Sequence, residues 1–228
     1  MSRRRPLVGI TADLAEHPNG VRVFSYTTYA SAVESAGGIP VLLAPAAGSA
    51  AELAGALDAF VLSGGDDPRT ESFGEPTHPR ATPVHPERQE FETALLRVLE
   101  SDRADTPVLG VCLGMQMMAL VGGGRLDQHL PDRCPTHALH WERDHAVEPT
   151  EEPGAPGVSL RGVVRSKHRQ AVMTPGRLRI VAASPDGIVE ALTDPARRFY
   201  LGVQWHPERT ADHAVGAALF EALVAAAR

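Results

Sequence analysis

The chain has 228 residues, 43% of them hydrophobic, which is enough apolar content for one folded domain over residues 1–228. Its formal net charge of −6 argues against nucleic acid as a partner, because a phosphate-binding surface normally carries a basic excess. No window approaches the ~18 apolar residues of a membrane span, and no apolar secretory stretch follows the basic start. We therefore expect a soluble, cytoplasmic chain that has no membrane partner.

The first half of the chain alternates between apolar runs and segments of helical spacing. Strands are expected at residues 7–11, 39–43, 59–62 and 108–111, and helices at 26–36, 49–57 and 86–100. Apolar strands separated by helices predict an α/β fold with a parallel sheet covered on both faces. In such sheets the functional groups gather at the carboxyl ends of the strands.

The second half shows short strand-like runs in place of helical periods. These runs cover residues 125–128, 139–147, 162–165, 178–183, 188–192 and 199–204. We expect mostly antiparallel hairpins, of which two or three extend the central sheet. Residues 149–157, rich in acids, proline and glycine, are expected to form a mobile surface loop, and 210–228 a closing helix.

A cysteine lies where the strand at 108–111 meets an apolar helical segment. Gly110 and Gly114 flank Cys112 in the pattern Gly-x-Cys-x-Gly, which is typical of a nucleophile elbow. Such a turn crowds its neighbours unless they are glycines, and it lifts the thiol to a helix N-terminus that favours thiolate. The alternative is that Cys112 is a small buried hydrophobic residue. Cys134, in a loop-like segment, is not expected to pair with it.

One histidine follows the last predicted strand, at the sheet edge where the elbow also lies. His206 and Glu208 are separated by Pro207, and an extended chain would place both side chains on the same side, so that the carboxylate holds the imidazole. The alternative is a solvated strand end. The remaining histidines outside 166–170 are expected at the surface or in loops: His17, His78, His85, His129, His137, His140, His145 and His213. A metal site built from His137, His140 and His145 lacks a carboxylate or cysteine at a known spacing, so no metal is predicted.

Two motifs together give the sequence a specific resemblance. Residues 110–116 (Gly-Val-Cys-Leu-Gly-Met-Gln) and 202–208 (Gly-Val-Gln-Trp-His-Pro-Glu) resemble the class I glutamine amidotransferase family. Residues 7–11, 36–41, 64–75 and 184–191 look like the stand-alone γ-glutamyl-γ-aminobutyrate hydrolases, the peptidase C26 group. The resemblance implies a flavodoxin-like three-layer sandwich, whose central sheet is mostly parallel and carries added antiparallel strands.

The resemblance also implies a role for each matching residue. It implies a catalytic triad of Cys112, His206 and Glu208, an oxyanion hole of the backbone amides of Gly64, Gly65 and Leu113, and substrate binding by Gln116, Ser166, His168 and Gln170. Without the resemblance, residues 166–170 are equally explained as a polar hairpin turn. The implied reaction uses no cofactor.

Two departures from the family pattern lie beside the expected substrate. Leu113 stands where these hydrolases commonly have arginine; amidotransferases that supply ammonia to a synthetase have leucine at this position. The Gly-Gly-Asp loop is also about two residues shorter than usual. Arg169 or Lys167 is a candidate for the missing charge. We expect a hydrolase that cleaves small γ-glutamylated amines, such as γ-glutamyl-γ-aminobutyrate, through a γ-glutamyl thioester.

Two alternatives to a free-standing hydrolase stay open. The first is a glutaminase subunit that supplies ammonia to a separate synthase, and the second is a non-catalytic binding module of the same fold. The sequence leaves open whether the chain forms a homo-oligomer, and which amine the substrate carries.

Overall fold

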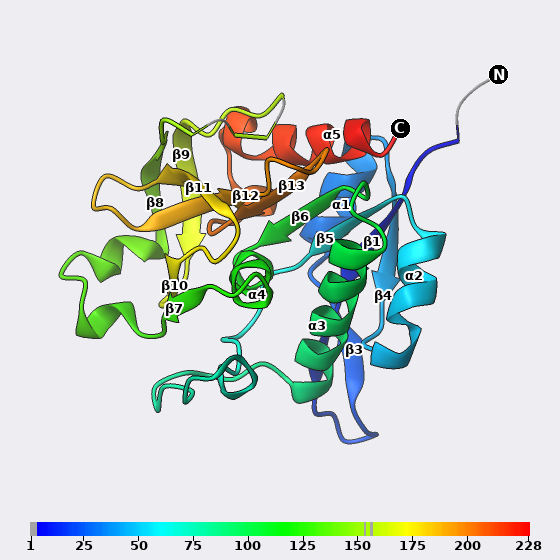
Figure 1. Ribbon diagram of the computed structural model, residues 1–228, viewed down its shortest axis with the longest axis horizontal. Coiled ribbons are helices and arrows are strands. Elements are labelled where there is room, and N and C mark those ends of the chain that lie inside the picture. The colour runs from blue at the N-terminus through cyan, green and yellow to red at the C-terminus, as the bar shows by residue number, and fades with distance from the viewer. Residues whose placement is uncertain (1–3, 153, 156) are drawn as a thin grey trace.

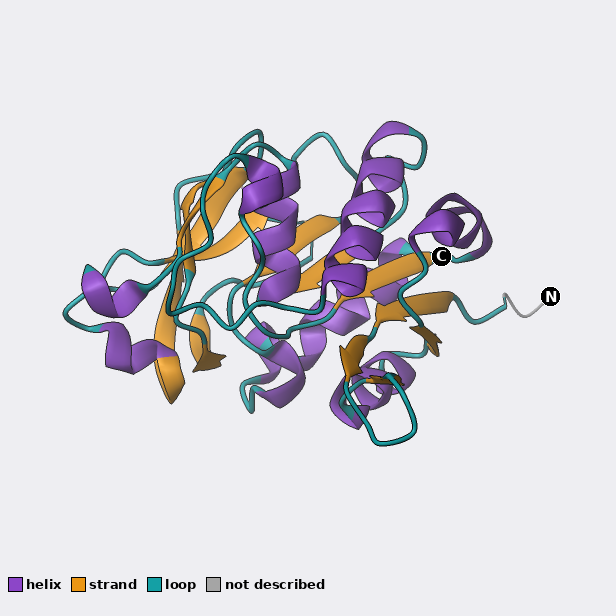
Figure 2. Ribbon diagram, turned by 90° about the horizontal axis from the view of Figure 1, so that it is seen from below, coloured by secondary structure: helices purple, strands orange, loops and turns teal. Residues whose placement is uncertain are grey.

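The computed structural model describes residues 4–152, 154–155 and 157–228. Within them, nine strands form one mixed sheet in the order β4-β1-β5-β6-β13-β12-β11-β8-β9. Helices lie on both faces of this sheet (Figures 1 and 2). The predicted three-layer α/β sandwich is therefore confirmed.

The apolar runs of the first half build the parallel part of the sheet. Its strands are β1 (Leu7–Thr11), β4 (Ile39–Leu43), β5 (Ala59–Leu62) and β6 (Val108–Val111). The helices are α1 (Thr27–Ser35), α2 (Ala50–Ala56), α3 (Pro86–Ser101) and α4 (Leu113–Val121). β1 pairs in parallel with β4 and β5, and β5 with β6. The predicted bounds of these four strands and of α1, α2 and α3 are confirmed to within one residue.

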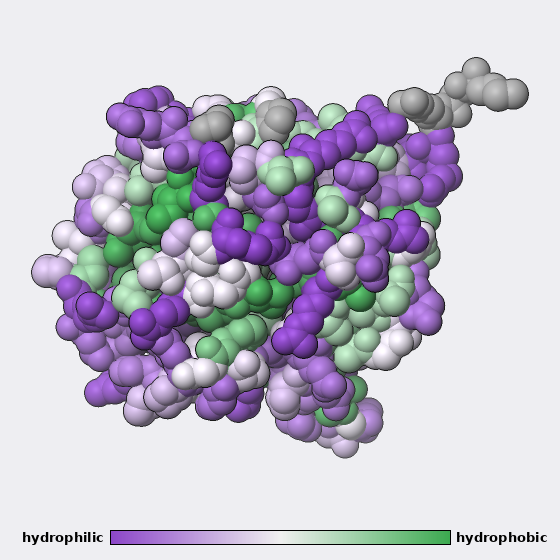
Figure 3. Space-filling view, viewed as in Figure 1, coloured by the Kyte–Doolittle hydropathy of each residue, from purple (hydrophilic) through white to green (hydrophobic). Residues whose placement is uncertain are grey.

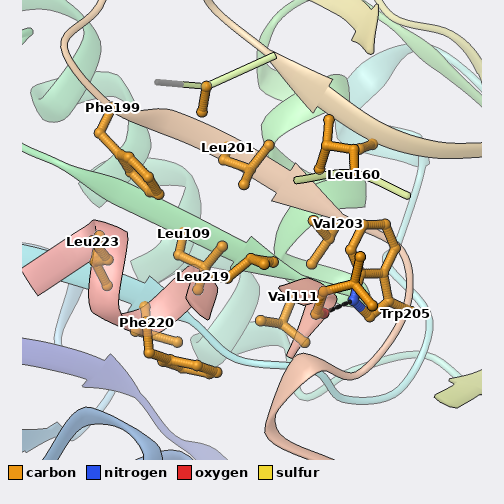
Figure 4. Close-up of a cluster of buried hydrophobic side chains, with 14 of the residues drawn as sticks. Leu109, Val111, Leu160, Phe199, Leu201, Val203, Trp205, Leu219, Phe220 and Leu223 are labelled. Atoms are coloured by element: carbon orange, nitrogen blue, oxygen red, sulfur yellow. Dashed lines mark hydrogen bonds between the residues drawn. The ribbon is translucent and has the colours of Figure 1, made fainter. Parts of the chain in front are cut away.

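Each face of the sheet has its own hydrophobic core, because alternate residues of a strand point to opposite faces. In β5, Ala59 and Val61 face one core, and Phe60 and Leu62 face the other. The first core is covered by α1 and α5 (Ala217–Ala226), and the second by α2, α3 and α4. Figure 4 shows the first core, in which α5 side chains cover β6 and β13.

Short strands extend the central sheet beyond β6, most of them in antiparallel pairs, as predicted. Five strands follow β6 in the sheet: β13 (Tyr200–Val203), β12 (Val189–Thr193), β11 (Arg179–Ala183), β8 (Trp141–Pro149) and β9 (Gly162–Lys167). β13 pairs antiparallel with β12, as expected of a hairpin, and on its other side it runs parallel to β6, so its carboxyl end lies at the same sheet edge as the elbow. All four residues of β13 are buried, which suits an interior strand covered on both faces.

Smaller elements complete the chain. β7 (Arg125–Asp127) pairs with β10 (Ala171–Thr174), and β2 (Asp13–Ala15) pairs with β3 (Arg22–Phe24), outside the main sheet. β2, β3 and β10 were not predicted. The strand expected from 139 begins at Trp141 after a short turn, and the closing helix begins at Ala217, after two 3-10 turns. The loop expected at 149–157 falls partly on positions 153 and 156, which lie outside the described residues.

The face of the molecule seen in Figure 3 is mainly polar. Figure 3 shows hydrophilic residues over most of one face, with apolar residues gathered over the antiparallel strands and around α4. Among the described residues, none of the helices combines the length and the apolar character that a membrane span requires.

Candidate active site

Cys112 forms a strained turn between β6 and α4. Its backbone has φ 50° and ψ −102°, a conformation that side-chain-bearing residues rarely adopt. A methyl group on Gly110 would lie 2.9 Å from the Gly114 carbonyl carbon, and one on Gly114 would lie 2.7 Å from Leu62 Cβ. Both glycines are therefore required for the close packing of the elbow.

The thiol of Cys112 is free and almost enclosed. The side chain is 5% exposed, and neither Cys112 nor Cys134 forms a disulfide, as predicted. Gln204 Nε2 donates to Sγ at 3.5 Å, and Sγ lies 3.9 Å from the Lys167 carbonyl oxygen. The Leu113 N–H is the first amide of α4, so it has no acceptor within the helix.

His206 follows β13 and is held by Glu208. Its Nδ1 lies 2.8 Å from Glu208 Oε1, and the Glu208 side chain is only 2% exposed. The expected extended geometry is wrong, because Pro207–Arg209 forms a 3-10 turn that folds the carboxylate back onto the ring. The preceding Trp205 is buried and donates from Nε1 to the Val215 carbonyl at 2.8 Å, which anchors this strand end (Figure 4).

The charge state of His206 follows from its neighbours. Burial lowers the pKa of the imidazole, but hydrogen bonds to Cys112 and Glu208, together with their negative charges, raise the pKa to about 10. The ring nitrogen opposite Glu208 is thus the one that serves the thiol. An imidazole held by a carboxylate beside the sulfur is the arrangement that a cysteine nucleophile requires.

The Gly64-Gly65 loop closes over the sulfur and the imidazole. A methyl group on Gly64 would lie 2.9 Å from His206 Cε1 and 3.6 Å from Cys112 Cβ. The Gly64 N–H donates to the Tyr29 hydroxyl at 2.9 Å, whereas the Gly65 N–H has no acceptor among the described residues. Of the two glycine amides, that of Gly65 is therefore the one available to an oxyanion.

Arg88 of α3, which the sequence analysis did not single out, holds this loop in place. Its guanidinium is 1% exposed, and Nη2 donates to the carbonyls of Ser63 at 2.8 Å and Gly64 at 3.1 Å. Glu92 at 3.0 Å and Asp13 at 2.9 Å balance its charge. The signal in the sequence is a pair of opposite charges, 88 and 92, on the apolar face of a helix.

A cavity of about 390 Å³ opens onto Cys112, His206 and the glycine loop. Its wall carries charges of both signs, with the cations Arg80, Lys167, Arg169 and Arg209 and the acids Asp13, Asp66, Asp67 and Glu208. Lys167 is engaged with Glu142 at 2.7 Å. Arg169 stacks 3.9 Å above the Trp141 ring. The cavity suits a small substrate that carries both positive and negative groups.

The four predicted substrate-binding residues occupy two different positions. Gln116 and His168 line the cavity, and Gln116 Nε2 donates to Gln204 Oε1 at 3.3 Å. Ser166 and Gln170 are buried behind the wall, where Ser166 Oγ donates to the His140 carbonyl at 3.2 Å. Ser166 and Gln170 therefore support the cavity wall from behind and do not line the cavity.

Two histidines that were expected at the surface are in the interior. His140 is 1% exposed and the His145 side chain is 7% exposed, since both face the buried carboxylate of Glu190. The expectation for these two residues is wrong, because a carboxylate within the apolar strand β12 needs polar partners. His137 is not part of this group.

Comparison with known proteins places the chain in a family. The sequence model of the Peptidase C26 family matches residues 6–208. A Mycobacterium tuberculosis protein provisionally named as a glutamine amidotransferase is 35% identical over 98% of this chain and 75% of its own length. The γ-glutamyl-γ-aminobutyrate hydrolase PuuD of Escherichia coli is 30% identical over 87% of this chain and 84% of its own.

Solved structures support the same fold. The glutaminase domain of Trypanosoma brucei CTPS with bound acivicin superposes with a TM-score of 0.68, at 16% identity, over 97% of this chain and 93% of that one. The fold is therefore that of class I glutamine amidotransferase domains, and the chain belongs to the Peptidase C26 family.

Proposed function

We propose that the protein is a cysteine-dependent hydrolase that cleaves the γ-glutamyl amide bond of a small γ-glutamylated amine. The observation that carries the proposal is that Cys112, His206 and Glu208 lie together beside Gly64, at a strained elbow that opens onto a charged cavity. Membership of the Peptidase C26 family and 30% identity to a named γ-glutamyl-γ-aminobutyrate hydrolase support a hydrolytic reaction.

The first half of the reaction forms a thioester. The Cys112 thiolate attacks the side-chain carbonyl carbon of the γ-glutamyl group, and the N–H groups of Leu113 and Gly65 donate to the developing oxyanion. His206, protonated at neutral pH because its pKa is about 10, gives its proton to the departing amine. The amine leaves, and a γ-glutamyl thioester remains on the sulfur.

The second half requires His206 to act as a base. Once the sulfur is acylated, the imidazole loses the charge and the hydrogen bond of Cys112, both of which raise its pKa. The lowered pKa suits His206 to remove a proton from water, which then attacks the thioester and releases glutamate. Glu208 holds the ring in one orientation throughout.

The cavity wall supports an amino-acid substrate. Asp66, on the wall, suits the α-ammonium group of the glutamyl moiety. Arg169 is the better candidate for a carboxylate on the amine half, because Lys167 is already paired with Glu142. This assignment fits γ-glutamyl-γ-aminobutyrate, and Arg169 would supply the charge of the arginine that Leu113 replaces.

The second candidate function is a glutaminase subunit that delivers ammonia to a separate synthase. Leu113 beside the sulfur favours it, as does the 35% identity to a protein provisionally named as a glutamine amidotransferase. The two functions make different predictions. A free-standing hydrolase turns over a γ-glutamylated amine as an isolated chain, whereas a glutaminase subunit prefers glutamine and depends on its synthase.

A panel of γ-glutamyl amides, glutamine included, tests the proposal with the isolated chain. Release of glutamate from γ-glutamyl-γ-aminobutyrate without a partner is expected from the wild type and from Cys134→Ala, the control that removes the other thiol. Cys112→Ala should lose activity by about 10³-fold or more. Turnover of glutamine alone, or only with an added synthase, would favour the second function, and full activity of Cys112→Ala would exclude both.

A further inference from the structure

Three histidines and a glutamate converge on one buried point in the antiparallel part of the sheet. His140 ends the turn before β8, His145 lies in β8, His168 follows β9, and Glu190 lies in β12. One nitrogen or oxygen atom from each residue lies within 4.8 Å of all the others. Strands β8, β9 and β12 lie together on the left of Figure 1. The cluster therefore joins segments that are far apart in the sequence.

Each imidazole is oriented by an oxygen atom on its outer side. These contacts are His140 Nε2 with Asp186 Oδ2 at 3.1 Å, His145 Nδ1 with the Ala146 carbonyl at 2.9 Å, and His168 Nδ1 with the Gln170 carbonyl at 2.8 Å. An oxygen acceptor fixes the proton on the nitrogen that faces it. The other nitrogen then presents its lone pair to the centre of the cluster.

The polar atoms at the centre of the cluster are unsatisfied. Glu190 Oε1 lies 3.3 Å from His140 Nδ1, 3.5 Å from His145 Nε2 and 3.7 Å from His168 Nε2. None of these nitrogens, and neither oxygen of Glu190, has a hydrogen-bond partner of good geometry among the described residues. Three lone pairs and a fully buried carboxylate around one point repel one another unless a cation lies between them.

We propose that His140, His145, His168 and Glu190 bind a divalent transition metal, for which Zn²⁺ is the best candidate. A tetrahedral ion with bonds of about 2.0 to 2.1 Å separates its ligand atoms by ~3.4 Å, close to the distances from Glu190. Imidazole and carboxylate are ligands that zinc prefers, and outer oxygens that hold the ligand imidazoles are the usual support of such a site. Asp186 also balances the single positive charge that zinc and one carboxylate leave.

The site is structural and takes no part in the hydrolysis. Four protein ligands complete a tetrahedron, so no position is left for water or substrate. The ion would tie β8 and β12 to the segment after β9. His168 sits between Lys167 and Arg169, both of which line the cavity, so the metal would also hold that part of the cavity wall in shape.

Metal analysis of the full chain tests the proposal. Protein produced in zinc-supplemented medium and dialysed against chelator-free buffer should contain about one zinc per chain. Glu190→Gln, which keeps the size of the side chain and removes its charge, should contain less than about a tenth of that amount. Glu221→Gln is the matched control, since Glu221 pairs with His213 at the surface, and it should bind zinc as the wild type does.

Two measurements on the wild type keep the test independent of the folding of Glu190→Gln. Removal of zinc with a chelator should lower the Tm, and its return should restore it. Replacement by Co²⁺ should give the strong visible absorption of a tetrahedral ion. If the wild type contains no zinc and its Tm does not change when zinc is added, the cluster is held together by a proton and not by a metal. Full zinc content in a folded Glu190→Gln would equally overturn the proposal.

Discussion

The imidazole of His206 links the sulfur to the carboxylate, and its pKa decides which proton it can move. Cys112 and Glu208 both raise this pKa, and burial opposes them. In the proposed reaction the ring would therefore begin as an acid. It would finish as a base because acylation of the sulfur removes one of the two groups that keep it protonated.

The Glu208→Gln variant tests this view of His206. In the wild type, kcat/KM should fall on the alkaline side as the imidazolium loses its proton near pH 10, because this proton is needed by the leaving amine. Glutamine at 208 keeps the shape but removes the negative charge, so the pKa of His206 falls and the alkaline limb moves to lower pH. Turnover should also drop by on the order of 10² to 10⁴. An alkaline limb that stays in place in pH–rate profiles of the variant would contradict the account.

At the scale of elements, α3 positions the glycine loop through one buried side chain. Arg88 donates to two carbonyls of the loop and is balanced by Glu92 and Asp13. Removal of the guanidinium leaves Glu92 and Asp13 without their cation, and the Ser63 and Gly64 carbonyls without their donor. The loop that carries the Gly65 amide would then lose its main support.

Arg88→Ala should therefore lower both stability and turnover. We expect the free energy of unfolding, measured with denaturant, to fall by about 3 to 5 kcal/mol. Arg97→Ala is the matched control, because Arg97 is exposed on the same helix, and its effect should stay within about 0.5 kcal/mol. If the two substitutions lowered the free energy of unfolding equally, Arg88 would not be the side chain that supports the glycine loop.

The elements that the sequence predicts best are those whose burial is uniform or strictly periodic. The fully apolar runs of β5 and β6 and the apolar face of α3 predict those elements to within one residue. The hairpin of β2 and β3 was missed, because its strands are short and only partly buried. The parallel pairing of β13 with β6 depends on a contact about ninety residues away, which no local pattern contains.

The same division applies to the site. Cys112, His206 and Glu208 lie at turns with a recognisable spacing, so they could be predicted from the sequence. Arg88 and Glu190 were missed, because each is a charge within an apolar helix face or strand, and the groups that reveal its role, the Gly64 carbonyl for Arg88 and His140 for Glu190, are distant in sequence. In both cases the signal in the sequence is a charged residue within an otherwise apolar run.

At the scale of the whole molecule, one sheet runs without a break from the parallel half to the antiparallel half. β6 and β13 join the two halves, and the first hydrophobic core spans both of them. Cys112 follows β6 and His206 follows β13, so the proposed catalytic pair lies at this junction. The two halves are therefore expected to fold as a unit.

A single unfolding transition is the consequence. Trp141→Phe leaves the buried Trp205, close to His206, as the only tryptophan. Its fluorescence and the far-ultraviolet circular dichroism of the whole chain should then change at the same denaturant concentration. Two separated midpoints would show that the antiparallel half unfolds independently and would contradict the single domain predicted over 1–228.

The most direct test of the account is the mass of the protein during turnover. Acid quenching of a reaction with γ-glutamyl-γ-aminobutyrate, followed by intact mass spectrometry and peptide mapping, should reveal one added glutamyl group on Cys112. The Cys134→Ala variant should carry the same group, and Cys112→Ala should carry none. A glutamyl group on Cys134, or turnover by Cys112→Ala without any adduct, would contradict the claim that the sulfur at the elbow is the nucleophile.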